Sequence, residues 1–364
     1  MSGLLAATLI TKDEEQVLDA CLASIRDVVD EIVVVDTGSG DGTVAIAEHH
    51  GARVQHLAWA GDFATARNAA LELTDCEWIL YIDADERLAP VERAAVESLL
   101  RGASEVAFRI LLKPDSRSTP YREFRLWRHD PRIRFEGVIH EKVVPAIQRV
   151  SEEDGRPIGI ADLLLVHVGY EGDQTRKHRR NLPLLQRQLA VEPDNLFNLH
   201  HLARVLEGLG EADEAEAVLA RAADVARSRP SDPLGSLALA DLVRLRHYRG
   251  EDVGELVGEA RELFPRNWHI VFLEARYLVD AARYEEALER FDRLLAVDVA
   301  TLVDEGPAYD ERLFGTLAYE GRGYCLFKLE RYEEAAETYA VAARLAPDDP
   351  SLDAKRRLAA ARAR

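Results

Sequence analysis

Cysteine is scarce in this chain, and its few copies lie far apart. Three cysteines (Cys21, Cys76 and Cys325) occur in 364 residues, without the paired spacing of a disulfide framework or a zinc knuckle. Their pattern excludes a small disulfide-stapled fold and predicts a reducing, cytoplasmic environment. The N-terminus also lacks a basic segment followed by an apolar one, so we expect no secretion signal.

An excess of positive charge and long apolar runs are lacking as well. The chain has 65 acidic and 46 basic side chains, and its formal net charge is −19. Nucleic acids and anionic membranes select basic surfaces, so we expect neither as a partner. No apolar run approaches the roughly 18 residues that cross a bilayer, so we expect no membrane span. A hydrophobic content of 47% is that of a globular protein with a full core.

The first half of the chain alternates short apolar runs with amphipathic stretches. The apolar runs predict strands at residues 4–10, 31–36, 52–57 and 77–83. Helical spacing of apolar residues predicts helices at 13–25, 43–50 and 62–73. This alternation predicts a mostly parallel sheet with helices on both faces. Looser patterns predict an antiparallel extension of the sheet, with strands at residues 105–112, 122–129, 135–144 and 162–170.

After Tyr170 the strand patterns disappear and the chain repeats itself. The phrases "ARYEEALERF" and "ERYEEAAETY" place Ala287 and Phe291 in register with Ala335 and Tyr339. Small and aromatic residues at these offsets are typical of the tetratricopeptide repeat, a pair of helices about 34 residues long. We therefore predict that the second half is a solenoid of three or four helix pairs.

These patterns together predict the domain organisation. An earlier copy of the repeat carries Ala215, Leu219 and Ala222 at the same offsets, a degenerate copy fills 233–265, and an insertion near 299–310 separates the last two copies. We predict an α/β domain at 1–170, a connecting segment at 171–195, and a repeat domain at 196–364.

The fourth predicted strand runs directly into a cluster of acids. In "WILYIDADE" Asp83 and Asp85 are one residue apart, so both would lie on one face of an extended strand. Parallel sheets bind ligands beyond the carboxyl ends of their strands, where Asp36 also stands. Paired carboxylates suit Mg²⁺ or Mn²⁺, which would relieve their repulsion and neutralise a substrate phosphate. Alternatively, Asp85 is the N-cap of a helix.

Two further segments have open interpretations. The glycine-rich "VVVDTGSGDGT" lets backbone N–H groups approach a ligand, but it lacks the features of a P-loop or a dinucleotide fingerprint, and it is equally a plain strand-to-helix loop. The arginine-rich "RSTPYREFRLWRHDPRIRF" either binds a diphosphate or steers an anionic acceptor, or it is a solvated strand face that pairs with acids of the repeat domain. The basic "TRKHRR" has the same two interpretations.

Four motifs resemble one family when they are taken together. "LITKDEE", "EIVVVDTGSGDGT", "DFATARNAAL" and "WILYIDADE", in this order and spacing, resemble family-two glycosyltransferases of the GT-A fold. The similar subgroup carries tetratricopeptide repeats and includes peptide S-glycosyltransferases of the sublancin type. The resemblance covers about the first 170 residues and implies a Rossmann-like α/β GT-A domain followed by an all-α solenoid. "KDEE" and "GSGDGT" depart mildly from the family's usual motifs but keep the acids.

The resemblance also implies roles for individual residues. It assigns the nucleotide base and ribose to Thr11, Glu14 and Asp36, places Arg67 and Asn68 near the nucleotide, and gives the metal and the diphosphate or ribose to Asp83 and Asp85. A histidine late in such a domain completes the metal site, which maps to His167, although a lone histidine is more often structural.

Inverting transfer needs a base for the acceptor's proton. We predict Glu141 in this role, with Glu86 as a weaker candidate. Alternatively, Glu141 is a surface acid that pairs with Lys142 or a nearby arginine.

The expected function is metal-dependent, inverting transfer of a hexose from a nucleoside-diphosphate sugar, with UDP as the expected nucleotide. The repeats would form a groove for a peptide or protein acceptor, or a homodimer surface. A second hypothesis is an inactive GT-A-like scaffold whose repeats bind a partner protein. Titration of UDP with and without Mn²⁺ separates the two hypotheses. UDP binding that depends on the metal is expected of the enzyme, and no binding is expected of the scaffold.

Overall fold

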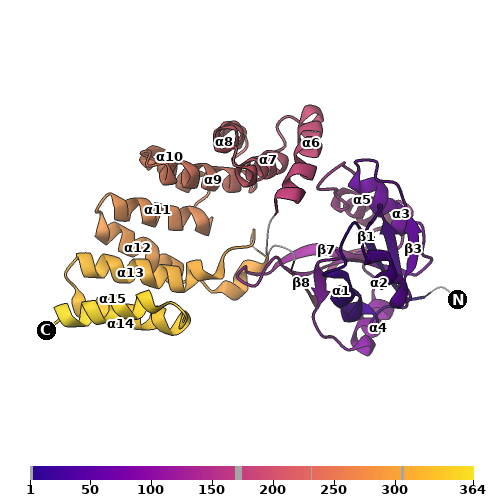
Figure 1. The fold of residues 1–364 in the computed structure, drawn as a ribbon, viewed down its shortest axis with the longest axis horizontal. Helices are drawn as coiled ribbons and strands as arrows, with labels where there is room; N and C mark the ends of the chain where they lie inside the picture. Colours follow the sequence, from indigo (N-terminus) through magenta and orange to yellow (C-terminus); the bar gives the residue numbers. More distant parts are fainter. Residues whose placement is uncertain (1–2, 169–173, 231, 305–306) are drawn as a thin grey trace. The chain divides into compact units, whose positions relative to one another are not determined.

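The apolar runs of the N-terminal half form one eight-stranded sheet in the computed structural model of the chain (Figure 1). The structure describes residues 3–168, 174–230, 232–304 and 307–364. It divides into two units, Met1–Ser116 with Pro120–Gln188, and Arg117–Thr119 with Leu189–Arg364.

The sheet of the first unit is parallel on one side and mixed on the other. Its strands are β1 (Leu5–Thr11), β2 (Glu31–Asp36), β3 (Arg53–His56), β4 (Trp78–Tyr81), β5 (Glu86–Leu88), β6 (Ala107–Lys113), β7 (Tyr121–Arg128) and β8 (Ile158–His167). They lie in the order β3-β2-β1-β4-β7-β6-β8-β5. The first four in this order are parallel, β7 is antiparallel to both neighbours, and β5 is antiparallel to β8. The predicted GT-A-like α/β sheet is thereby confirmed.

Helices cover both faces of this sheet. They are α1 (Leu18–Ile25), α2 (Thr43–His49), α3 (Phe63–Leu71), α4 (Arg93–Gly102) and α5 (Val144–Asp154). Alternate residues of each strand point to opposite faces. In β1, Leu5 and Leu9 pack in one core with α1, α2 and α4, whereas Ala6 packs in a second core with α3 and α5. The sheet is therefore the middle of three layers.

Two local predictions in this unit were wrong. Residues 135–144 form no strand: Glu136 and Lys142 make an isolated bridge, and α5 begins at Val144. Gly137 (φ +105°) and His140 (φ +51°) interrupt extended backbone, while Ile139 is buried, so the apolar pattern reflects burial.

The geometry of the acidic motif also differs from the prediction. β4 ends at Tyr81, and the chain then turns, with the N–H of Glu86 donating to the carbonyl of Asp83 (3.0 Å). Asp83 and Asp85 therefore do not share the face of an extended strand. The alternative is wrong as well, because β5 rather than a helix follows Asp85.

Helix α6 (Thr175–Val191) covers most of the predicted connecting segment. Its residues through Gln188 belong to the first unit. The predicted boundary at 170/171 lies outside the described residues, and the domain limits stay a prediction.

The second unit consists of paired helices, as predicted (Figure 1). They are α7 (Leu196–Leu209), α8 (Ala212–Ser228), α9 (Gly235–Tyr248), α10 (Gly254–Leu263), α11 (Trp268–Asp280), α12 (Tyr284–Leu295), α13 (Thr316–Lys328), α14 (Tyr332–Leu345) and α15 (Pro350–Arg362). Two short 3₁₀ helices, η1 (Val299–Asp304) and η2 (Glu311–Phe314), occupy the insertion between α12 and α13. The side chains of Asn195 and Asn267 cap α7 and α11, each accepting a backbone N–H three residues on.

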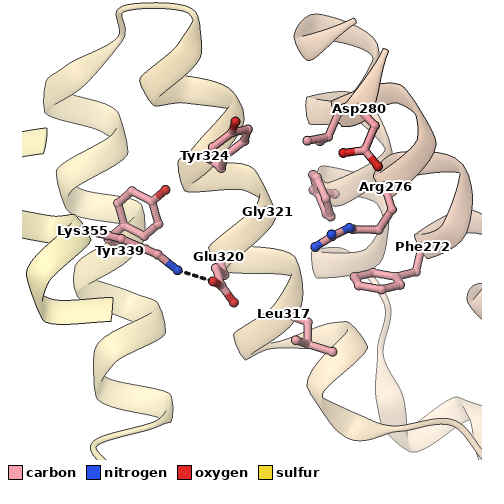
Figure 2. A pocket seen from close by; sticks show the side chains of 11 residues that line it. Phe272, Arg276, Asp280, Leu317, Glu320, Gly321, Tyr324, Tyr339 and Lys355 are labelled. Carbon is pink, nitrogen blue, oxygen red and sulfur yellow. Dashed lines mark hydrogen bonds and ion pairs between the residues drawn. The ribbon is translucent and has the colours of Figure 1, made fainter. Parts of the chain in front are cut away.

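A cavity of about 260 Å³ opens among the last helices of this unit (Figure 2). Aromatic side chains from α11, α12, α13 and α14 line it together with charged ones, namely Arg276, Asp280, Glu320 and Lys355. Lys355 pairs with Glu320. The repeats therefore carry a small amphipathic pocket of their own. Across the described chain, no helix combines the length and the hydropathy that crossing a bilayer would require.

Candidate active site

The carboxyl ends of β1 and β2 form the first part of the site. Thr11 and Asp36 are register partners, and Asp36 is buried, with 1% of its surface exposed. Its carboxylate accepts the N–H groups of Gly38 (3.0 Å) and Ser39 (3.1 Å). Burial raises the pKa of Asp36, but hydrogen bonds from the Ser39 side chain and from these two N–H groups outweigh it and hold the pKa below its usual value. Asp36 therefore orders the glycine-rich loop as a carboxylate.

Asp83 lies at the centre of a buried ionic network. Arg67 of α3 donates to Asp83 Oδ1 (2.9 Å), and Arg125 of β7 lies 3.5 Å from Oδ2. The hydroxyl of Tyr81 donates to the same carboxylate (3.2 Å). Burial raises the pKa of Asp83, but the two guanidinium groups outweigh it and hold the pKa well below the usual range. Asp83 is therefore ionised and held in one position.

The ring of Tyr81 lies between the two arginines. The guanidinium carbons of Arg67 and Arg125 are each 4.2 Å from the ring centroid. The antiparallel register of β4 and β7, with Leu80 opposite Leu126, brings Arg125 next to Tyr81. These cation–π contacts fix the planes of both guanidinium groups and so orient the carboxylates that they hold.

Glu86 belongs to the same network but has a different charge balance. It is 1% exposed, its Oε1 accepts from Arg125 (2.9 Å), and its Oε2 accepts the N–H of Asp83 (2.8 Å). Burial and the nearby charge of Asp83 raise the pKa of Glu86 to about 7, although Arg125 opposes them. Its burial removes it from any acceptor, so its visible role is to fix the acidic turn.

Asp85 and His167 form a second pair beside this network. The antiparallel register of β5 and β8 sets His167 opposite Glu86, which brings the imidazole beside Asp85. Nε2 of His167 lies 3.2 Å from Asp85 Oδ2, and Nζ of Lys177 on α6 lies 3.4 Å from the same oxygen. Burial raises the pKa of Asp85, but the bond with His167 and the nearby cations lower it overall.

The remaining predicted residues are divided between these groups. Glu141 pairs with Nε of Arg67 and is thereby linked to Asp83. Glu14 follows β1, where burial and then the charge of Asp85 raise its pKa. Asn68 is structural, because its side-chain amide bonds to both the carbonyl and the N–H of Phe135 (2.9 and 2.8 Å).

The sequence interpretation missed Tyr81 and left Arg125 unassigned within its arginine-rich run. The neighbours of Arg125 in that run have ordinary roles. Arg122 lies beside Asp162 (3.2 Å), and Arg132 pairs with Asp130 (2.6 Å). Arg125 differs from them only because β7 pairs with β4. No feature of the run itself could have indicated its place in the ionic network.

A three-layer α/β domain with buried acids at its strand ends, followed by paired helices, defines a GT-A-type domain joined to helical repeats. Residues 8–137 match the family model "Glycosyl transferase family 2", and this part of the chain is a domain of that family.

Relatives span both parts of the chain. A TPR repeat-containing protein of Synechococcus elongatus is 33% identical over 230 residues, which are 61% of this chain and 57% of the relative. The SPbeta prophage-derived glycosyltransferase SunS of Bacillus subtilis is 28% identical over 217 residues, 57% of this chain and 50% of SunS. The chain thus spans about half the length of these relatives.

Among solved structures, the glucosyl-3-phosphoglycerate synthase of Mycobacterium tuberculosis in complex with Mn²⁺, UDP and glucosyl-3-phosphoglycerate is 17% identical, with a TM-score of 0.36. That likeness covers 52% of this chain and 79% of the synthase. At such a score it carries no conclusion about this chain.

Proposed function

We propose that this chain is a metal-dependent, inverting glycosyltransferase that moves a hexose from a UDP-sugar to an acceptor. The observation that carries the proposal is the Asp85–His167 pair, 3.2 Å apart beside the carboxyl end of β4 and next to a family-two domain core. Its position is where parallel sheets receive their ligands. The description of SunS as a glycosyltransferase supports the same class of activity.

The side chains of Asp85 and His167 fit a divalent cation whose remaining ligands come from the substrate. A carboxylate oxygen and an imidazole nitrogen 3.2 Å apart can both bind one ion of the size of Mg²⁺ or Mn²⁺. Within the part of the chain that is described, no group of three or more acids, histidines or cysteines could hold a metal. Asp85 and His167 would therefore hold the ion together with diphosphate oxygens. When bound, it would neutralise charge on the departing diphosphate.

The chain's own residues supply the other requirements of a single displacement. An acceptor atom bonds to the anomeric carbon as the bond to the diphosphate oxygen breaks, and Glu141 takes the acceptor's proton. In the structure Glu141 pairs with Arg67, as the alternative interpretation expected, and Arg67 holds it beside Asp83. To act as the base, Glu141 would exchange this partner for the acceptor. Thr11 and Glu14 would contact the nucleoside, and Asp36 would present the loop that it orders.

We further propose a peptide or protein acceptor, recruited by the repeats. The cavity beside Arg276 and Tyr324 has both an apolar wall and charged groups, as a peptide side chain with its backbone requires (Figure 2). We also propose that the repeats could form a homodimer surface, as the alternative use of the same unit. The three cysteines are buried and unpaired, which supports a cytoplasmic location.

Replacement of Asp85 tests the proposed site. We expect Asp85→Ala to slow the release of UDP from UDP-sugars roughly 100-fold, because the diphosphate loses its counter-ion. The measurement is a screen of UDP-sugars for hydrolysis with Mn²⁺ and Mg²⁺. Asp27→Ala is the matched control, since that side chain is 87% exposed. Hydrolysis at the unaltered rate in Asp85→Ala, with metal still required, would exclude the assignment.

A further inference from the structure

The first turns of α6 carry cations that the mechanism above does not use. They come from the basic run "TRKHRR" and lie in the first unit. Arg176 Nη2 lies 2.5 Å from Asp13 Oδ2, in the loop after β1, and Lys177 Nζ lies 3.4 Å from Asp85 Oδ2. The basic run is thus turned toward the acidic strand ends.

Arg180 lies one turn further along the same helix. Its guanidinium is 5.2 Å from the ring of Phe63, and Nε donates to Asn181 (3.0 Å). Burial lowers the pKa of Arg180 and Arg176 adds to this, whereas the charges of Glu14 and Asp85 oppose the shift. Among the described residues, however, no carboxylate lies within ion-pair distance of Arg180. Residues three apart on a helix share one face, so Lys177 and Arg180 can contact one ligand.

The other cations near the acids are committed to protein groups. The side chains of Arg67 and Arg125 are 10% and 6% exposed and are occupied by Asp83, Glu86 and Glu141. Arg87 donates to backbone carbonyls, including that of Val17 (2.6 Å). Lys177, in contrast, is 42% exposed and bonds weakly to Asp85. A ligand at Asp85 can therefore recruit Lys177 without breaking a buried network.

We propose that Lys177 and Arg180 bind the diphosphate of the nucleotide sugar and so stabilise the leaving group. This inference rests on the proposed function. With Asp85 holding the cation, Lys177 would exchange its carboxylate partner for a phosphate oxygen, and Arg180 would gain an anionic partner. Ammonium and guanidinium groups are suited to phosphate oxygens, and such charge-assisted bonds are the stronger class of hydrogen bond.

Binding of UDP and of uridine to the full chain tests this assignment, with and without Mn²⁺, by isothermal titration. We expect Lys177→Gln and Arg180→Gln each to weaken UDP roughly tenfold and to leave uridine unchanged, because only UDP carries phosphates. Lys177→Arg should retain UDP binding, since it keeps the charge. Arg179→Gln is the matched control, as the same helix exposes it.

The outcomes separate this inference from the proposed function. If the unaltered chain binds UDP and both glutamine variants bind it equally well, the assignment of Lys177 and Arg180 is wrong and the proposed function stands. If the unaltered chain binds no UDP, the proposed function fails. Inorganic pyrophosphate then tests the two cations directly: binding that Lys177→Gln weakens supports them, and no binding overturns the inference.

Discussion

At the scale of the residue, two carboxylates that contact the same cation have pKa values shifted in opposite directions. Arg125 contacts both Asp83 and Glu86, yet the pKa of Asp83 is lowered and that of Glu86 is raised to about 7. Asp83 has a second guanidinium, that of Arg67, whereas Glu86 is fully buried and feels the charge of Asp83. Neighbouring carboxylates that share a cation separate in pKa for this reason.

This separation predicts a pH dependence of stability. Folding raises the pKa of Glu86 from 4.5 to about 7, so its contribution is full below pH 4.5 and is lost as pH rises through 7. The side chain introduced in Glu86→Gln cannot ionise, so the stability of this variant does not fall with pH for this reason. We expect the stability advantage of the unaltered chain over Glu86→Gln to shrink between pH 5 and pH 8 by on the order of 2 kcal/mol.

Thermal unfolding of both proteins at the two pH values measures this difference. Asp27→Asn serves as the control for the loss of an exposed carboxylate, because that side chain is 87% exposed. An advantage that stays constant or grows toward pH 8 would contradict the charge balance described for Glu86.

At the scale of the element, glycines inside the repeat helices have opposite roles. A Cβ added to Gly321 in α13 would lie 2.2 Å from Cζ of Phe291, which is fully buried on α12. A Cβ added to Gly258 in α10 would meet nothing within 4 Å. Gly321 therefore permits the close approach of two helices, whereas Gly258 only lowers helix propensity.

The two glycines give a matched pair of substitutions. We expect Gly321→Ala to destabilise the repeats by about 1–3 kcal/mol through overpacking, and Gly258→Ala to stabilise them by about 0.5–1 kcal/mol. Chemical denaturation followed by far-ultraviolet circular dichroism measures both. Equal effects of the two changes would mean that α13 can move away from Phe291 at no cost.

At the scale of the whole molecule, the candidate chemistry belongs to one unit. Every residue of the candidate site, including Lys177 and Arg180, lies in the unit that ends at Gln188. The repeats contribute a separate cavity, around Gly321. If the proposed function holds, the proposed activation of the sugar and the proposed recruitment of the acceptor can be separated experimentally.

A fragment of residues 1–192 tests that separation. We expect it to release UDP from the UDP-sugar at a rate close to that of the full chain, because it keeps the acids, His167 and α6. Transfer to a peptide acceptor should require the repeats. The measurement compares UDP release and glycosylated product for both chains, with circular dichroism as the control for folding. A folded fragment without hydrolysis would refute the separation.

The sequence by itself determined the elements that depend on local spacing. Apolar runs marked β1, β2 and β4, and the recurring small residues marked the paired helices, because burial of one face leaves a period in the chain. It also placed Asp83 and Asp85 directly after the buried strand β4, and their role in the candidate site stays a prediction. The strand predicted at residues 135–144 was wrong. The apolar side chains of this segment are buried, but they belong to a loop and to the beginning of α5.

Only the tertiary structure decided which groups meet. The pairing of β4 with β7 brings Arg125 to Tyr81, and the pairing of β5 with β8 brings His167 to Asp85. These partners lie 44 and 82 residues apart along the chain. The apolar pattern of a strand limits its register, but which distant strands pair is decided by the whole sheet and its two cores.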